Sequence, residues 1–475
     1  MAPIVRWLFG IAAAAVFAGQ GVAFPSGTSA EEVREDGPEV ITRDVCIIGG
    51  GSSGTYAAIR LQDEGKSVMV IEKDSQLGGH TSTYVDPETG TPVDYGVVVF
   101  HDLDLVKDYF NRLGVKHHTA TLRVPGNTYH ANMQSGELFP KYAPPNPMTS
   151  FQTYGQQLAR YPGLEKGFNF PTPIPEDLIL PFGEFVEKYN ISDAVPTIAM
   201  FAHGLGTLRE QTTLYVMKNF GLGVLQNMQS GFLAATSNNN HEIYDKALEI
   251  LQPNVLTESH VVSMSRNSSD GVTVTVDSPS GQKIIQASKL LVAIPPKLDN
   301  LDGFDLDETE SSLFGQFLNT GYYTSLITNT GFPNGVSSVE NMDPTKPYNL
   351  PSLPGIYDVT GSRIPGLYSV KYGSPTGIPD EDVKADIISS LKRLQLTGFS
   401  EKAEPEFVRF SSHAPFELTV PVEAIKSGFY EDLYGLQGHR NTFYTGAAFH
   451  TQDSSLLWQF TEDLLPQLGV GNGES

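Results

Sequence analysis

Three patterns in the sequence predict an α/β fold that is built on a Rossmann-type nucleotide-binding domain and carries a second, α+β domain. A short apolar run near the N-terminus passes through a glycine-rich turn into a helix-like segment. Runs of β-branched residues separated by turn residues follow in the middle of the chain, and a second strand-turn-helix pattern lies near the C-terminus. Alternation of this kind is typical of a parallel sheet with helices packed on its faces.

The composition is that of a globular protein with many loops. Of the 475 residues, 40% are hydrophobic and 18% are charged, so the chain can bury a large core. Its 46 glycines and 32 prolines predict many turns and argue against a long helical bundle. The formal net charge of −23 repels phosphate backbones, and we therefore expect no nucleic-acid partner.

The N-terminus has the layout of a secretory signal peptide, which we assign to residues 1–23. A basic residue precedes an apolar run over residues 7–18, and small residues follow it. This run is shorter than the roughly 20 residues that a membrane-spanning helix needs, so we expect no stable membrane span and a secreted or luminal protein. Residues 24–41 are acidic and poor in large apolar side chains, which predicts a disordered leader.

Entry into the secretory pathway has two consequences for individual residues. Asn190 and Asn267 each begin an Asn-x-Ser triplet and become candidate glycosylation sites. Cys46 is the single cysteine, so the chain has no internal disulfide. Because Cys46 stands in an apolar run, we expect it to be an inert core residue.

The first apolar run, residues 44–48, opens into a glycine turn and then into a helical pattern. The spacing Gly49-x-Gly51-x-x-Gly54 has a mechanical explanation: the first glycine makes the tight turn, the second lets the backbone approach a pyrophosphate, and the third packs the helix on the strand. The helix N-terminus then faces the phosphates. A second apolar run ends in Glu72, about 20 residues further on, where an acid can bind ribose hydroxyls. Together these features predict a dinucleotide site rather than a chance glycine-rich turn.

Two further motifs indicate which dinucleotide is bound. Paired glycines, Gly78 and Gly79, follow the acid within a few residues, and Asp94-Tyr95-Gly96 comes later. With the glycine turn, these motifs resemble the flavin amine-oxidase superfamily of FAD oxidoreductases, and more closely the fungal β-cyclopiazonate dehydrogenase family. The resemblance runs from about residue 45 to the C-terminus and implies FAD as the cofactor.

The resemblance also implies where the cofactor is held. A strand near Val261 lies against the adenine end, and the last helix, which begins near Ser455, points at the pyrimidine edge of the flavin. The segment around Phe416 offers no cysteine for covalent attachment, so the FAD is noncovalent unless a histidine such as His80 bonds it. The residues assigned to the cofactor site are Gly49, Gly51, Ser53, Gly54, Glu72, Lys73, Gly78, Gly79, His80, Val261, Gly446, Ala447 and Ser455.

If both ends of the chain contact one cofactor, the FAD-binding domain is discontinuous. It then comprises residues 42–102, 225–300 and 405–475. The substrate-binding domain comprises residues 103–224 and 301–404 and forms a cap. Helices are expected in the cap at residues 103–113, 182–189, 208–219 and 380–394.

The sequence departs from the amine oxidases at three positions. His80 replaces the arginine that usually follows the paired glycines, so the phosphate charge must be neutralised differently. Ser325 stands where many amine oxidases have a lysine beside the flavin, and Ser455 stands where some have a tyrosine of an aromatic cage. These departures weaken the interpretation as a classical amine oxidase.

Candidates for catalysis are few, because FAD itself supplies the redox chemistry. His101 lies in a stretch that passes beside the flavin in the resembled family and is a candidate proton acceptor, and His450, just before the last helix, is another. A structural hydrogen-bonding role is the alternative for both. For the substrate pocket we assign Tyr323 and Phe416. Tyr322 and Tyr323 are neighbours in a strand, so at most one of them faces the substrate.

The complete FAD frame and the weakened amine-oxidase site predict an FAD-dependent oxidoreductase. We expect it to dehydrogenate an apolar fungal specialised metabolite, of indole tetramic acid or terpenoid type, with oxidative ring closure. The electron acceptor stays open between oxygen and another compound. The enzymatic alternative is a secreted flavin amine oxidase that produces hydrogen peroxide, and the alternative of another class is a non-catalytic flavin-binding protein. Neither a His-Glu-x-x-His motif nor a cysteine pair occurs, so no metal is expected.

Overall fold

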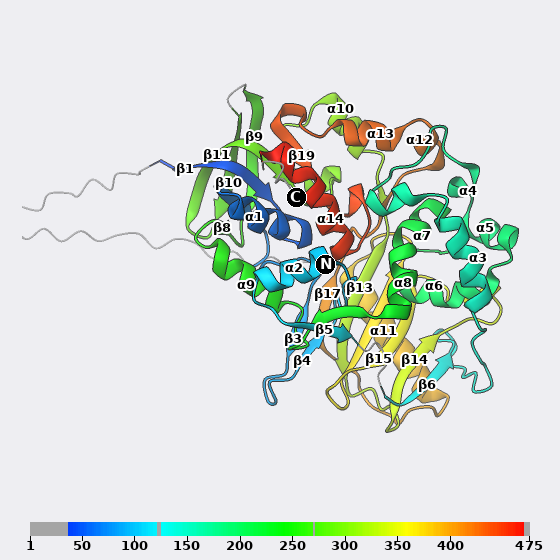
Figure 1. The fold of residues 1–475 in the computed structure, drawn as a ribbon. Coiled ribbons are helices and arrows are strands. Elements are labelled where there is room, and N and C mark those ends of the chain that lie inside the picture. Colours follow the sequence, from blue (N-terminus) through cyan, green and yellow to red (C-terminus); the bar gives the residue numbers. More distant parts are fainter. Residues whose placement is uncertain (1–36, 121–124, 269–270, 470–475) are drawn as a thin grey trace, which may run out of the picture. The chain divides into compact units, whose positions relative to one another are not determined.

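The computed structural model describes residues 37–120, 125–268 and 271–469 (Figure 1). The predicted signal peptide, residues 1–23, lies outside the described residues. Most of the predicted leader, residues 24–41, does so as well, but its last residues belong to the first strand, which begins at Glu39. Within the described part of the chain, no helix is both long and apolar enough to cross a bilayer.

A seven-stranded sheet forms the core of the nucleotide-binding domain. Its strands lie in the order β8-β2-β1-β11-β10-β9, and β19 pairs with the end of β11. Strands β8, β2, β1, β11 and β19 are parallel, whereas β10 is antiparallel to β11 and to β9. The strands are β1 (Glu39–Ile48), β2 (Val68–Ile71), β8 (Val255–Leu256), β9 (His260–Ser268), β10 (Gly271–Ser278), β11 (Gly281–Val292) and β19 (Thr442–Tyr444).

The second half of β1 is buried on both faces, which its uninterrupted apolar run predicts for a parallel strand. Val45 and Ile47 pack in the cluster that includes the neighbouring helices, whereas Cys46 and Ile48 pack in the cluster on the opposite face. Cys46 is fully buried, and burial raises the pKa of its thiol to about 12. The thiol therefore stays protonated, as expected for an inert core residue.

Helix α1 (Ser52–Asp63) follows β1, and α14 (Ser454–Leu464) lies beside it (Figure 1). One carboxylate joins them. Glu462 accepts hydrogen bonds from Tyr56 Oη at 2.7 Å and from Nε and Nη2 of Arg60 at 3.0 and 2.9 Å. This bidentate contact fixes the last helix against the first.

Two more helices cover the same face of the sheet, α2 (Asp104–Arg112) and α9 (Glu242–Leu251). The ring of Tyr109 in α2 meets Trp458 of α14 edge-on at 4.7 Å. Helix α2 lies in the range 103–224 that was expected to belong to the cap, but its apolar face packs in the nucleotide-binding domain.

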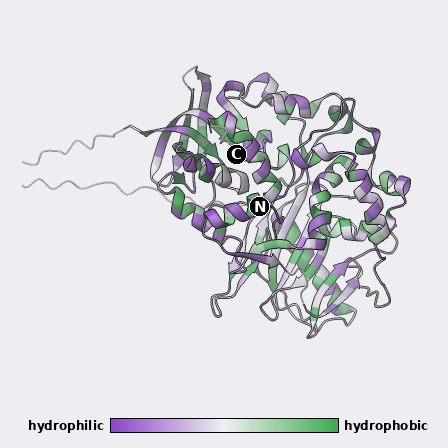
Figure 2. Ribbon diagram, in the orientation of Figure 1, coloured by the Kyte–Doolittle hydropathy of each residue, from purple (hydrophilic) through white to green (hydrophobic). Residues whose placement is uncertain are grey.

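A six-stranded sheet, in the order β17-β13-β16-β15-β14-β6, forms the second domain. Hydrophilic and hydrophobic residues are mixed along the strands of this sheet (Figure 2), and they alternate along β16. The apolar face packs on α11 (Asp380–Leu396). Residues 406–412 fall in the range 405–475 that was expected to belong to the FAD-binding domain, but they form β17, which pairs with β13 of this sheet. The strands are β6 (Asn127–Ala131), β13 (Gly321–Thr328), β14 (Val336–Asn341), β15 (Gly355–Gly361), β16 (Tyr368–Ser374) and β17 (Glu406–Ser412).

The remaining elements are helices and two-stranded ribbons around the two sheets. The helix expected at residues 208–219 begins only at Thr213, because the amides of Glu210 and Gln211 both donate to the carbonyl of Thr207 in a preceding turn. The helices are α3 (Met148–Leu158), α4 (Glu176–Ile179), α5 (Phe182–Tyr189), α6 (Val195–Phe201), α7 (Thr213–Asn219), α8 (Leu222–Ser230), α10 (Glu308–Phe314), α12 (Val422–Lys426) and α13 (Phe429–Gly435). The ribbons pair β3 (Thr83–Val85) with β4 (Pro92–Asp94), β5 (His117–Ala120) with β7 (Phe232–Ala235), and β12 (Leu318–Asn319) with β18 (Leu418–Thr419).

A buried ion cluster joins β9, α10 and β19. The guanidinium of Arg266 is fully buried and donates to Glu310 Oε1 at 2.6 Å, to Glu310 Oε2 at 2.9 Å and to Asp305 Oδ1 at 2.7 Å. Tyr444 Oη donates to the same carboxylate at 2.6 Å. Burial opposes ionisation of Glu310, but these hydrogen bonds hold its pKa below the usual value. The carboxylate is therefore ionised and depends on Arg266.

We expect Arg266→Met to lower the free energy of unfolding by about 3–5 kcal/mol, because it removes the bidentate cation of the buried Glu310 carboxylate and leaves only the longer contact with Arg440, at 3.3 Å. Urea denaturation measures the change. The control is Arg112→Met, which removes a half-exposed ion pair with Asp63 and should cost no more than about 1 kcal/mol. Similar small losses in both variants would contradict the assignment of Arg266 as a buried structural cation.

Candidate active site

The carboxyl ends of the parallel strands meet at one edge of the first sheet. The amide of Gly49 donates to the carbonyl of Ile71 at 2.8 Å, and the amide of Ala293 donates to the carbonyl of Ile48 at 2.8 Å. A cavity of about 2380 Å³ opens at this edge and extends to the second sheet. This edge is where open α/β sheets bind ligands.

The glycine turn brings strand and helix into close contact. Gly49 has φ +101°, and a Cβ at Gly54 would lie 1.9 Å from the carbonyl oxygen of Gly49. Gly51 differs from both, because a Cβ there would approach only Gly79 Cα, at 3.8 Å, and would point into the cavity. The first and third glycines thus serve the fold, and the second leaves room for a ligand.

The N-terminus of α1 is open toward the cavity. No side chain caps the helix. The hydroxyl oxygens of Ser52 and Ser53 are buried and have no hydrogen-bond partner among the described residues. Unpaired helix amides and hydroxyls at an N-terminus are suited to a phosphate. These groups therefore fit the pyrophosphate of a dinucleotide.

Glu72 lies at the end of β2 and lines the cavity. Its carboxylate accepts hydrogen bonds from the amides of Gly50 at 2.6 Å and Asp74 at 2.9 Å. Burial raises the pKa of this carboxyl above its usual value, although both amide hydrogen bonds oppose the shift. Each oxygen keeps a lone pair for a ribose hydroxyl. Lys73 follows on the cavity wall, with an exposed side chain.

Val261 lies at the same end of the cavity as Glu72. It lines the wall two residues after Ser259, whose amide donates to the carbonyl of Glu72 at 2.9 Å. Val262 points outward and is 41% exposed. Gly78 completes this end, since its amide donates to the carbonyl of Gly50 at 2.9 Å.

The segment between β19 and α14 lines the end of the cavity opposite to Glu72 and Val261. Gly446 (φ +108°) and Ala447 follow β19 and line the cavity. Helix α14 begins after Asp453, whose carboxylate accepts a hydrogen bond from the amide of Leu456 at 3.0 Å. The N-terminal end of α14 lines the cavity through Asp453 and Ser454, so its positive dipole end faces a bound ligand.

His101 does not line the cavity. It is buried, and its backbone amide donates to Ser455 Oγ at 2.9 Å. Its Nε2 lies 3.1 Å from Asp453 Oδ2, an ion pair rather than a well-aligned hydrogen bond. Burial opposes protonation of His101, but Asp453 outweighs it and raises the pKa; burial also opposes ionisation of Asp453, whose pKa is nonetheless lowered to about 2 beside His101. His101 and Ser455 thus hold the start of α14 from behind, so the placement of His101 does not fit a proton acceptor from substrate.

His450 is also turned away from the cavity. Its Nδ1 lies 3.0 Å from Nζ of Lys218, and its Nε2 lies 3.0 Å from the carbonyl oxygen of Glu165. Burial and the neighbouring Lys218 hold its pKa well below the usual value. With both ring nitrogens engaged by protein groups, its position fits a structural role.

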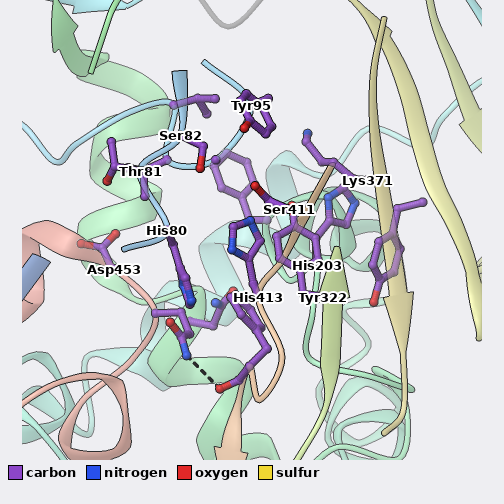
Figure 3. A pocket seen from close by; sticks show the side chains of 18 of the residues that line it. His80, Thr81, Ser82, Tyr95, His203, Tyr322, Lys371, Ser411, His413 and Asp453 are labelled. Atoms are coloured by element: carbon purple, nitrogen blue, oxygen red, sulfur yellow. Dashed lines mark hydrogen bonds between the residues drawn. The ribbon is translucent and has the colours of Figure 1, made fainter. Parts of the chain in front are cut away.

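His80 occupies the cavity in front of the second sheet (Figure 3). Its ring stacks on Phe416 with centroids 5.7 Å apart and lies 4.5 Å from the ring of His413. Burial, with Lys73 adding to it, lowers the pKa of His80 to about 4. The imidazole is therefore neutral at pH 7. It lies with Tyr322, His413 and Phe416 in the part of the cavity next to the second sheet, which we call the chamber, and not at the glycine turn.

Phe416 lines the cavity as predicted for a pocket residue, but Tyr323 does not. The hydroxyl of Tyr323 donates to the carbonyl of Ile378 at 2.8 Å and accepts from the amide of Ile378 at 2.9 Å, on the side covered by α11. Tyr322 lines the cavity instead and packs on Phe416 at 4.9 Å. The assignment of Tyr323 was wrong because neighbouring strand residues face opposite sides and the sequence does not show which side is covered.

His413 is a chamber residue that sequence reasoning missed. Its Nε2 lies 3.1 Å from Thr324 Oγ1, and burial together with His80 holds its pKa well below the usual value. Thr324 and His413 face the cavity side of the sheet. Ser325, at the position where many amine oxidases have a lysine beside the flavin, is fully buried and does not line the cavity. The signal in the sequence was strand alternation: His413 comes two residues after Ser411 and therefore lies on the same side of the sheet.

The two predicted glycosylation sites differ in what the structure describes. Asn190 ends α5 in a left-handed conformation (φ +51°) and is exposed. Asn267 belongs to the end of β9, and its side chain lies outside the described part of the chain. Glycosylation at both positions stays a prediction.

Comparison with known proteins agrees with this geometry. Residues 47–113 match the family described as NAD(P)-binding Rossmann-like domain. The chain is 40% identical to the FAD-dependent oxidoreductase dbaF of Emericella nidulans, over 91% of this chain and 92% of that protein. It is 36% identical to β-cyclopiazonate dehydrogenase of Aspergillus flavus, over 91% of this chain and 94% of that protein.

Two solved structures show the same fold at low identity. A CLA-producing fatty acid isomerase from P. acnes matches with a TM-score of 0.73 and 20% identity, over 90% of this chain and 99% of the other. Wild-type putrescine oxidase bound to putrescine matches with a TM-score of 0.62 and 18% identity, over 90% and 99%.

We expect Gly51→Ala to weaken FAD binding roughly tenfold or more, about 1.4 kcal/mol, without destabilising the apoprotein. The added methyl meets no protein atom closer than 3.8 Å but occupies the space that the ligand backbone approaches. Titration of apoprotein with FAD and thermal unfolding measure the two effects. Gly54→Ala is the contrast, because its methyl collides with the carbonyl oxygen of Gly49 and should destabilise the fold itself. Normal FAD affinity in Gly51→Ala would contradict the site.

Proposed function

The chain belongs to a family of fungal FAD-dependent oxidoreductases that includes β-cyclopiazonate dehydrogenase, and from this premise we propose that it dehydrogenates a specialised metabolite with ring closure. It is an FAD-dependent enzyme of the kind found in fungal secondary-metabolite pathways. Bound FAD supplies a two-electron acceptor for a hydride. The open Gly51, the unpartnered hydroxyls of Ser52 and Ser53, and Glu72 fit its adenosine diphosphate half. The start of α14 fits its redox end.

The pair of neutral imidazoles in the chamber carries the proposal. Oxidative ring closure removes a hydride, with its bonding electron pair, from a substrate carbon, and an O–H or N–H group of the substrate then bonds to that carbon. The proton of this group needs an acceptor. His80 and His413 lie side by side, and burial keeps both rings uncharged at pH 7. Either imidazole is suited to take the proton.

The size and lining of the cavity support a large substrate. Its volume of about 2380 Å³ exceeds the roughly 300–1,000 Å³ typical of a pocket for one small molecule. A dinucleotide and a polycyclic metabolite can therefore be held together. Apolar side chains from α6 and the segment before β15 line the part beyond the chamber, namely Met200, Phe201, Tyr348 and Leu350.

The positions that differ from the amine oxidases favour this reaction over amine oxidation. Ser455 is fully buried and its hydroxyl accepts the amide of His101, so it contributes no aromatic wall to the chamber. On β13, Thr324 points to the cavity side with its hydroxyl engaged by His413. Phe416 and Tyr322 form an aromatic wall of a different composition.

Deletion of the gene tests the proposed reaction. The culture should accumulate a metabolite that is two hydrogen atoms heavier than the missing product, as seen by mass spectrometry. When this metabolite is added anaerobically to purified holoenzyme, the flavin absorption near about 450 nm should bleach. Bleaching by simple amines such as putrescine, with no response to the accumulated metabolite, would support an amine oxidase instead.

We expect His80→Asn and His413→Asn each to slow flavin reduction by the accumulated metabolite, within the roughly 10²–10⁴-fold range of a general base. The wild-type rate should be flat from about pH 5 to 8 and fall as the pH drops through about 4, since the pKa of His80 is lowered to that value and only the neutral ring accepts a proton. Stopped-flow absorbance measures the rate. His117→Asn, a histidine that packs on Phe110 outside the cavity, is the control.

A further inference from the structure

The cavity-facing side of the second sheet carries a continuous row of polar and charged side chains. In register across the sheet, the row contains Ser411, Thr324, Lys371, Asp358, Glu340 and His130. A parallel row of uncharged hydroxyls contains Ser369, Thr360, Ser338 and Thr128. The opposite side of the same strands is apolar and covered by α11. The floor of the chamber is therefore polar, although its far walls are apolar.

Lys371 is the ammonium group of this row. Its Nζ lies 3.5 Å from Asp358 Oδ2, which is long for a hydrogen bond, and the side chain is 32% exposed toward the cavity. An ammonium group has three N–H donors. No other hydrogen bond of Lys371 occurs among the described residues, so donors remain for a ligand.

Asp358 stands behind Lys371 and is the more deeply buried partner, with 12% of its side chain exposed. Oδ1 accepts a hydrogen bond from Thr360 Oγ1 at 2.8 Å. Burial opposes ionisation, but Lys371 holds the pKa of Asp358 below its usual value. The carboxylate thus holds the ammonium in place, and of these two cavity-lining groups the ammonium is the more exposed.

Besides Asp358, two stacked rings, His203 and Tyr357, lie near Lys371. The ring of His203 stacks on Tyr357 at 4.3 Å with an angle of 16°, and Tyr357 Oη accepts the amide of Gly204 at 3.2 Å. Burial lowers the pKa of His203 to about 3 despite the nearby Asp358, so the ring is neutral. Figure 3 shows Lys371, His203 and Tyr322 gathered beside His413.

The next carboxylate along the row has its own partner. Glu340 Oε2 lies 3.2 Å from His130 Nε2. Glu340 pairs with Asp358 across the strands and not with Lys371, so it lies one strand farther from the chamber centre. Within the row, the ammonium is therefore the charged group nearest to Thr324, whose hydroxyl contacts His413.

We propose that Lys371, held by Asp358 and flanked by the rings of His203, Tyr357 and Tyr322, binds an acidic, planar conjugated group of the substrate, a carboxylate or a ring enolate. This assignment rests on the proposed dehydrogenase function and names its substrate class. Lys371 pairs with Thr324, which contacts His413, and neighbouring strands are about 4.8 Å apart. The acidic group is thus bound close to the carbon that reacts, where its negative charge stabilises the positive charge left by hydride loss.

Binding to the oxidised holoenzyme tests this proposal without turnover. The probes are 2-naphthoate, its neutral analogue 2-naphthamide and the cationic 2-naphthylmethylamine, each titrated by the change in flavin absorption. The wild type should bind the acid at least about tenfold more tightly than the amide, a difference of about 1.4 kcal/mol. Tighter binding of the amine than of the acid would overturn the proposal, because the carboxylates of the row would then dominate.

The variants show whether Lys371 is the cause. Lys371→Met should bring the acid and the amide to equal affinity, and Lys371→Arg should keep the preference. Lys346→Met, which removes another lysine of the cavity wall, should leave the preference unchanged. A preference that persists in Lys371→Met overturns the proposal. Lys371→Gln replaces Lys371→Met if the latter fails to hold FAD.

The two proposals fail in distinguishable ways. If the accumulated metabolite bleaches the flavin but the probes show no preference for the acid, the dehydrogenase function is supported and the Lys371 site is contradicted. If the preference for the acid depends on Lys371 but no metabolite bleaches the flavin, the Lys371 binding site is supported and the proposed reaction is contradicted. Loss of flavin reduction in Lys371→Met with unchanged probe affinities would instead assign Lys371 a role beside the flavin.

Discussion

The close contact between α1 and the end of β1 sets the geometry of the whole site. A Cβ at Gly54 would lie 1.9 Å from the carbonyl oxygen of Gly49, so the helix approaches the strand as only glycine permits. This contact brings the N-terminus of α1 to the strand ends, where it lines the cavity in a position suited to a phosphate. Helix α14 is then fixed on α1 by the bidentate contact of Arg60 with Glu462. Two helix N-termini, from opposite ends of the sequence, are thereby placed along one cavity, which both of them line.

Features that depend on neighbours in sequence were predictable, and features that depend on packing between distant segments were not. The glycine spacing and the acid after the second strand identify the dinucleotide site because turn, helix and strand are contiguous. His101 looked catalytic because it follows a motif, yet its partner Asp453 lies at the other end of the chain. The side on which Tyr323 lies depends on where α11 packs. The same reason explains why residues 406–412 were placed in the FAD-binding domain, since their own sequence does not show that they pair with β13 of the second sheet.

The polar face of the second sheet is another feature whose role could not be predicted from the sequence. Strands that alternate polar and apolar residues are typical of an antiparallel sheet with one face in water. In the sequence, Lys371 and Asp358 therefore look like surface residues of such a sheet. In the structure that face is turned toward the nucleotide-binding domain and encloses the cavity with it. A pattern that normally indicates solvent here indicates a ligand site, and only the arrangement of the two sheets separates these meanings.

The titratable side chains of the chamber are either neutral, as in His80 and His413, or paired with a carboxylate, as in Lys371. This arrangement suits the loss of a hydride from the substrate. Hydride removal leaves positive charge on the substrate, and a fixed cation about 5 Å away would raise its energy by about 3 kcal/mol at an effective dielectric constant of about 20. That is more than a hundredfold in rate. Burial keeps His80 and His413 neutral, and Lys371 is compensated by Asp358. An arginine at position 80, which the amine oxidases usually carry, would place a permanent cation in this space. The neutral imidazole of His80 therefore carries no fixed charge into the space beside His413 and Phe416.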